Sequence, residues 1–426
     1  MSWFPIRRDP AAPNARAALR ATPRATGRLA GPVTGIVTGK VAAVAAGLLA
    51  VLVTSMGTVS CASWHPVERR AGWTLYVADG ASVKIEEFNL ALEPAFIFVE
   101  ETLGPFKAPV RIHAFHGGVG VADDGRRTLV AGGDGLTEPI AGIGPTRVRA
   151  FHSRGGPFEA PGIFLGVADV GTAVHELVHA RLAEESRRLP LWFEEGLATL
   201  LGDGALFEGR WVVDGLAYWP LVELNGEELD DACLARLLLL DAGDHPSLRD
   251  DALTRFVGWA VLFDLYRRVG HLHPFTWFEE FEEGRDAAHL RTHLMRTLAP
   301  ETIGVWLQRL DDPDPGVRFA TARGAWKLGS LEVYELLLNA LEKEQHAEVS
   351  LGLAINLLCA TGELDLKRDL RGRSWRAIRR ALSTAQPADP SEAAAVTELG
   401  RSLRFWWRRG ADTRPALDAL ARYWRE

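Results

Sequence analysis

The chain is poor in cysteine. Its 426 residues contain only Cys61, Cys233 and Cys359. None of them forms a CxxC pair or a Cys/His spacing typical of structural zinc sites. A fold built on disulfides is therefore excluded. Cys233 and Cys359 are either buried thiols or the two halves of one disulfide, and the sequence leaves both alternatives open.

The chain after residue 60 has fewer basic than acidic residues. The formal net charge is −7, and residues 1–60 hold seven basic residues and one acidic residue, so the rest of the chain carries −13. Because an acidic surface repels phosphates, we do not expect nucleic acid as a partner. The apolar fraction of 47% and the charged fraction of 24% are those of an ordinary globular protein. The length is sufficient for two or three domains.

Long apolar runs are also rare, and the most prominent one lies at residues 41–53 (VAAVAAGLLAVLV). It follows a long basic region rich in Ala and Pro, which is the shape of an export signal. The residues before Cys61 resemble a bacterial lipobox, and this resemblance implies that Cys61 is lipidated after cleavage. An uncleaved membrane anchor and a simple secreted protein are the alternatives. A further alternative is that translation of the natural protein starts at a later residue. All of them export the body, so we expect it at the bacterial cell envelope, lipid-anchored or membrane-anchored.

The strongest motif in the chain is HExxH at residues 175–179 (HELVH). Apolar residues around it recur at helical spacing, which predicts an amphipathic helix. Residues four apart lie on one face of a helix, so His175 and His179 can bind one ion. Glu176 is rotated by about 100° from His175. Its carboxylate is therefore expected beside a water on that ion, outside the first coordination shell.

A third ligand is needed, because catalytic zinc sites combine three protein ligands with one water. Residues 191–201 are predicted to form a second helix, which Pro190 can start. This helix carries Glu195, sixteen positions after His179. Gly196 is expected to let the two ligand-bearing helices approach closely. Glu194 is the rival third ligand, because spacing alone does not distinguish neighbours on a helix.

HExxH followed by WxxEGxA at residues 192–198 (WFEEGLA) resembles the gluzincin metallopeptidases. The resemblance implies an α+β zincin-like core, with a small mixed sheet beside the active-site helices. In that architecture the edge strand of the sheet can bind an extended peptide. It further implies Glu176 as the general base for peptide hydrolysis. It also implies one zinc ion with three ligands, namely His175, His179 and Glu195.

The pattern before and after the motif predicts several further elements. Strands are predicted at residues 73–78, 110–115, 148–152 and 163–167, and a helix at 82–103. No strand is predicted in the Gly/Asp-rich stretch that ends near residue 144. A hairpin is predicted at 205–213. Helices are predicted at 230–240, 251–269, 275–281, 287–298 and 302–310. The aromatic helix at 251–269 is expected to support the two metal-site helices.

From residue 311 the chain is predicted to be all-α. The DPDPxVR start and the paired helices that follow resemble HEAT repeats. We therefore expect a signal or anchor segment at 1–60, a gluzincin-like metallopeptidase domain at 61–310 and a HEAT-like helical domain at 311–426. Such a repeat array can bind a protein partner. Two arginine clusters, at 371–373 and 376–380, are either a solvated helix face or a partner or lipid surface.

Other polar residues receive weaker assignments. A donor for the oxyanion is needed besides the metal, and the sequence does not choose among Tyr218, Tyr266, His271 and His273. Three histidines on or beside predicted strands are expected to be surface or core residues, with a role in the site as the alternative, namely His113, His116 and His152. His289 and His293 have helical metal-ligand spacing but no evident third ligand.

Two functions are compatible with these patterns. The leading hypothesis is an exported zinc-dependent peptidase that acts on a peptide or protein substrate. The alternative is a catalytically weak zincin scaffold that binds proteins of the cell envelope through its C-terminal helices. Glu176 favours the peptidase, because a scaffold has no physical need for a carboxylate at this position.

Overall fold

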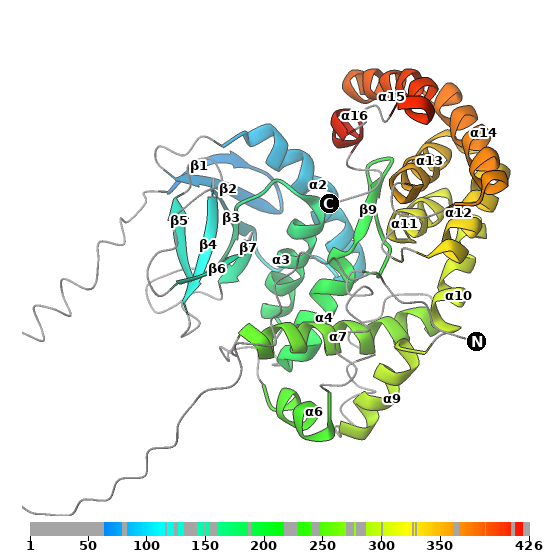
Figure 1. Cartoon of the computed structure of the whole chain (residues 1–426). Coiled ribbons are helices and arrows are strands. Elements are labelled where there is room, and N and C mark those ends of the chain that lie inside the picture. Colours follow the sequence, from blue (N-terminus) through cyan, green and yellow to red (C-terminus); the bar gives the residue numbers. More distant parts are fainter. Residues whose placement is uncertain are drawn as a thin grey trace, which may run out of the picture. The chain divides into compact units, whose positions relative to one another are not determined.

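Most of the chain after residue 63 is described by the structure, which is a computed structural model (Figure 1). The described residues are 64–78, 83–115, 117–122, 127–131, 143–148, 150–153, 161–185, 189–216, 229–240, 248–269, 277, 287–299, 301–325, 328, 330–361, 366–387, 389–409 and 414–420. Several predictions fall outside them: the N-terminal segment with Cys61, most of the predicted helix at 275–281, and His116, Tyr218, His271 and His273.

A five-stranded mixed sheet precedes the motif helices in the chain. Its strands are β1 (Trp64–Arg69), β2 (Trp73–Ala78), β3 (Val110–Ala114), β7 (Ala150–Ser153) and β8 (Gly162–Leu165), in the order β1-β2-β3-β8-β7. The two central pairings, β2 with β3 and β3 with β8, are parallel, and the outer two are antiparallel. The expected small mixed sheet is therefore confirmed. β7 lies at one edge of it.

A second sheet lies in the Gly/Asp-rich stretch, where no strand was predicted. It consists of β4 (Gly117–Ala122), β5 (Arg127–Ala131) and β6 (Ile143–Val148), all antiparallel. The prediction was wrong here because strand formation by such residues depends on backbone pairing between neighbours. Glycine contributes little intrinsic β-propensity or side-chain alternation that a sequence pattern would show.

Two helices share an apolar core with the five-stranded sheet: α2 (Ile85–Leu103) and α3 (Val170–Ala183). Side chains from all three layers are fully buried, among them Leu75, Ile112, Val99, Val174 and Leu177. α3 begins at the N-cap Asp169, whose carboxylate accepts a hydrogen bond from the backbone N–H of Thr172 at 2.7 Å. The cap and the buried apolar stripe together fix where the HExxH turn begins.

The second motif helix, α4 (Leu191–Gly202), packs against α3 and also against α7 (Leu248–Val269), which lies across it (Figure 1). The expected support from the aromatic helix is thus present. Gly196 touches α7 and not α3: a Cβ there would lie 2.3 Å from the backbone carbon of Gly258. The close approach between α3 and α4 occurs instead at Gly171, where a Cβ would lie 2.6 Å from the carbonyl oxygen of Gly202. The expected role of Gly196 was therefore assigned to the wrong helix pair.

A tight hairpin follows α4, as predicted, and consists of β9 (Gly204–Phe207) and β10 (Arg210–Val213). Its two turn residues, Glu208 and Gly209, have φ values of 49° and 78°, as a two-residue hairpin turn requires. Trp211 donates a hydrogen bond from its indole N–H to the carbonyl of Leu201 at 2.8 Å. The hairpin is therefore attached directly to the end of α4.

All described elements after the hairpin are helical, which confirms the predicted all-α region. They are α6 (Asp231–Leu238), α7, α9 (Ala287–Thr297), α10 (Glu301–Leu307), the 3₁₀ helix η3 (Gln308–Asp311), α11 (Pro315–Ala325), α12 (Leu331–Lys343), α13 (Ala347–Thr361), α14 (Arg368–Thr384), α15 (Pro390–Arg409) and α16 (Arg414–Ala419). None of the helices within the described residues is both long and apolar enough to cross a membrane. Cys233 and Cys359 are not joined in a disulfide.

The helical region shares its core with the hairpin. Phe207 belongs to the same buried cluster as Phe319 and Tyr334. At the surface, Arg210 donates two hydrogen bonds to the carboxylate of Asp314, at 2.8 and 2.9 Å. The hairpin thus connects the two motif helices with the C-terminal helices, and the domain boundary at 310/311 stays a prediction.

The glycine contact between α4 and α7 leads to a stability prediction. Gly196→Ala should lower the free energy of unfolding by at least about 2 kcal/mol, because the added methyl group overlaps the backbone of α7. The matched control is Gly304→Ala in α10, where a Cβ meets no atom within 4 Å. It should raise stability by about 0.5–1 kcal/mol. Denaturant unfolding of both variants measures the difference, and equal stabilities would contradict the contact.

Candidate metal centre

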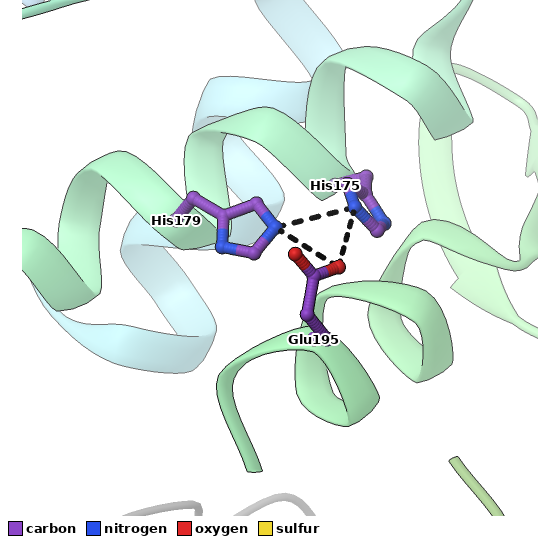
Figure 2. Close-up of side chains that lie close together, drawn as sticks. All are labelled: His175, His179 and Glu195. Atoms are coloured by element: carbon purple, nitrogen blue, oxygen red, sulfur yellow. Dashed lines mark hydrogen bonds and ion pairs between the residues drawn. The ribbon is translucent and has the colours of Figure 1, made fainter. Parts of the chain in front are cut away.

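Three side chains from the two motif helices point toward one another (Figure 2). Nε2 of His175 and Nε2 of His179, both on α3, lie 3.2 Å apart. Oε2 of Glu195, on α4, lies 3.7 Å from each of these nitrogens. The two separations of 3.7 Å are too long for good hydrogen bonds. They are ion-pair distances, which a protonated imidazole and the carboxylate can share.

The spacing of these three atoms fits a metal ion. A point equidistant from atoms that are 3.2, 3.7 and 3.7 Å apart lies about 2.1 Å from each of them, which matches the length of zinc–nitrogen and zinc–oxygen bonds. Within the described part of the chain, His175, His179 and Glu195 are the one group of three such ligands that could hold a metal ion. Two imidazoles with one carboxylate are also a donor set that divalent transition metals accept.

The second nitrogen of His179 is held by Glu194. Nδ1 of His179 lies 3.0 Å from Oε1 of Glu194, and both side chains are buried. A hydrogen bond from Nδ1 to a carboxylate leaves Nε2 available to a metal and fixes the direction of the ring. The structure therefore separates the two rival ligands: Glu195 faces the ring nitrogens that converge, and Glu194 orients one of the rings.

The His175 ring is fixed from the same helix. It donates a hydrogen bond to the backbone carbonyl of Ala198, which lies on α4 three residues after Glu195. Both imidazoles thus have an outer partner on α4, one side chain and one backbone group. Such outer partners are typical of metal-binding histidines, because they set the tautomer and the ring orientation.

The electrostatics of the group are those of a buried, charged cluster. Burial lowers the pKa of His179, but the carboxylates of Glu195 and Glu194 outweigh it and raise that pKa to about 10. Burial and the positive His179 ring lower the pKa of His175 to about 3. For Glu195, burial raises the pKa, and the opposing effects of Arg255 and His179 hold it below its usual range. Without a metal, one proton on His179 therefore supplies part of the positive charge.

Glu176, the expected general base, lies in α3 directly after His175 and is only 6% exposed. Glu194 and Glu195 are 4% and 6% exposed. Two short helices therefore carry three buried carboxylates. Buried charges are stable only when they are paired or bound to a metal, so these carboxylates need positive charge close to them.

Sequence reasoning missed Arg255. This residue projects from α7, and its Nη2 lies 3.2 Å from Oε2 of Glu195. A signal for it was present: Arg255 is the one charged residue between positions 253 and 263, within the apolar, aromatic part of that helix. A charge in a segment that packs against the core needs a buried partner. The sequence does not say which partner.

The strand histidines differ in their surroundings. His152, on the edge strand β7, has its ring 6.5 Å from the ring of His179 and nearly parallel to it. It therefore neighbours the candidate metal centre, which favours the alternative of a place in the site over that of an ordinary surface or core residue. His113 stacks on Phe164 and Tyr76. Burial and then Arg111 lower the pKa of His113 to about 4, so it is the core histidine that was expected.

Two other sets of candidates lie elsewhere. Tyr266 is on α7, eleven residues after Arg255, which corresponds to about 16 Å along a helix axis. Its hydroxyl lies 3.5 Å from Nη2 of Arg309, so it does not serve the centre. The rings of His289 and His293 are neighbours. However, Nδ1 of His293 lies 2.8 Å from the buried carboxylate of Asp264, and the structure gathers no third ligand for this pair among the described residues.

Comparisons with protein families, curated proteins and solved structures gave no match. What the centre can do chemically therefore follows from its own residues.

Metal binding to this centre should release a proton. In the metal-free protein the raised pKa keeps His179 protonated up to about pH 10, and a metal requires the neutral ring. About one proton should therefore leave per ion bound near pH 8, and affinity should rise with pH up to about pH 10. Calorimetry in buffers of different ionisation enthalpy counts the protons. The control variant His346→Gln, which is changed away from the centre, should release as many protons as wild type. If wild type released no proton on binding zinc, the assignment of His179 would be contradicted.

Proposed function

We propose that this protein is an exported zinc-dependent peptidase of the gluzincin type. The observation that carries the proposal is the convergence of three atoms at metal-binding distances on His175, His179 and Glu195. These are the residues for which the HExxH and WxxEGxA motifs imply zinc ligation. The order of the elements also supports it, because a small mixed sheet and a helix precede the two motif helices.

Each residue of the centre has a distinct task in the proposed reaction. When bound, zinc supplies Lewis acidity, which polarises a carbonyl group and acidifies water. The two imidazoles and Glu195 would hold the ion. Glu194 and the backbone of Ala198 keep the rings aimed. Glu176 takes a proton from the attacking water and passes it to the departing amine, as a general acid and base.

The substrate class follows from the strand beside the centre. β7 is the edge of the five-stranded sheet and packs next to α3. Edge strands offer backbone N–H and C=O groups to an extended chain. A peptide paired with β7 would run past His152, whose ring neighbours His179. An extended peptide or an unfolded protein segment is therefore the proposed substrate.

The proposed location rests on the N-terminal sequence alone. Residues 1–60 have the features of an export signal, and Cys61 has the position of a lipidated residue. Export would place the catalytic body at the bacterial cell envelope, anchored by a lipid or by the apolar segment itself. Its substrates would then be envelope peptides or proteins.

Glu176→Gln tests the mechanism. The amide has nearly the shape of the acid but does not accept a proton, so the variant should bind one zinc ion and lose peptide hydrolysis by at least about 100-fold in kcat. The control is Glu93→Gln, an exposed glutamate of α2, which should keep full activity. Zinc content and cleavage of a peptide library are measured for all three proteins. Wild-type rates in Glu176→Gln would remove this residue from the mechanism.

A further inference from the structure

The guanidinium of Arg255 contacts the same oxygen that faces the metal centre. Its Nη2 lies 3.2 Å from Oε2 of Glu195, and this Oε2 is also the atom 3.7 Å from both imidazole nitrogens. The Arg255 side chain is 26% exposed and that of Glu195 8%. A carboxylate that is almost fully buried is thus shared between a resident cation and the place where an ion would be held.

The helix crossing fixes this contact. Glu195 directly precedes Gly196 on α4, and Arg255 lies one helical turn before Gly258 on α7. The backbones touch at these two glycines, so any side chain there would move Arg255 away from Glu195. The contact is therefore a consequence of how α4 and α7 pack, and it does not depend on a flexible surface arginine finding a partner.

Charge decides what the contact does. Glu176, Glu194 and Glu195 are all buried in the two motif helices, and a divalent cation and a guanidinium both offset their negative charge. Two cations that serve one carboxylate repel each other, so each weakens the binding of the other. Arg255 should therefore matter most when no metal is bound.

We propose that Arg255 is a positioning residue that serves as the resident counter-ion of Glu195. It holds the carboxylate toward the two imidazoles in the metal-free protein, and it lowers the affinity of the centre for zinc. The inference rests on the proposed function only in that Glu195 is a metal ligand. Because of Arg255, the three ligand side chains keep their orientation in the metal-free protein. The centre also binds zinc less tightly than the same three ligands would without Arg255.

The test compares Arg255→Gln and Arg255→Lys with wild type, each with zinc and after chelation. Gln keeps a hydrogen-bond donor but removes the charge, whereas Lys keeps the charge. Without zinc, Arg255→Gln should have a Tm more than about 3 °C below that of wild type. With zinc bound, its Tm should differ little from that of wild type. It should bind zinc at least about tenfold more tightly than wild type does. Arg255→Lys should behave as wild type. The control is Arg401→Gln, which removes an exposed ion pair with Glu398 and should change neither state.

The other outcomes overturn the proposal. Equal loss of Tm with and without zinc, or no folding in either state, would make Arg255 a structural tie between α4 and α7. Weaker or unchanged zinc binding in Arg255→Gln would exclude a competing counter-ion. A wild-type protein that binds no zinc would remove the metal centre and this role together. If zinc binds as described but no peptide is cleaved, the peptidase proposal fails and the role of Arg255 stands.

Discussion

The structure depends on one electrostatic constraint: α3 and α4 place three carboxylates and two imidazoles inside the protein, within a few turns of helix. Such a group is stable only if positive charge offsets the carboxylates. Arg255 provides some of it, and a proton on His179 provides more. A divalent cation at the three converging atoms would replace that proton. Binding of a metal would then be coupled to the loss of that proton.

Backbone packing makes this concentration of charge possible. Glycines at two helix crossings, Gly171 with Gly202 and Gly196 with Gly258, bring α3, α4 and α7 closer than side chains would allow. At such short distances the polar groups of one helix reach the next, and Glu194, Ala198 and Arg255 become partners of the ligands. The hairpin after α4 contributes buried side chains to the core of the C-terminal helices.

The parts of the molecule that sequence could predict are those encoded by short-range periodicity. The helical spacing of His175 and His179, the hairpin turn at Glu208 and the buried aromatic helix all follow from neighbours in the chain. Arg255 lies sixty positions after Glu195, and only the crossing of α4 with α7 brings the two together. His152 is a similar case, because its place beside His179 depends on the strand order of the sheet.

The central claim concerns which atoms surround the ion, and X-ray absorption at the zinc edge of the loaded protein tests it most directly. The account predicts one zinc ion per chain with two imidazole nitrogens, one carboxylate oxygen and one further light atom, at about 2.0–2.2 Å. Replacing Glu195 with Gln should alter this shell, and replacing Glu194 should leave its composition unchanged. A shell with sulfur ligands, or one that is the same after Glu195→Gln, would contradict the account.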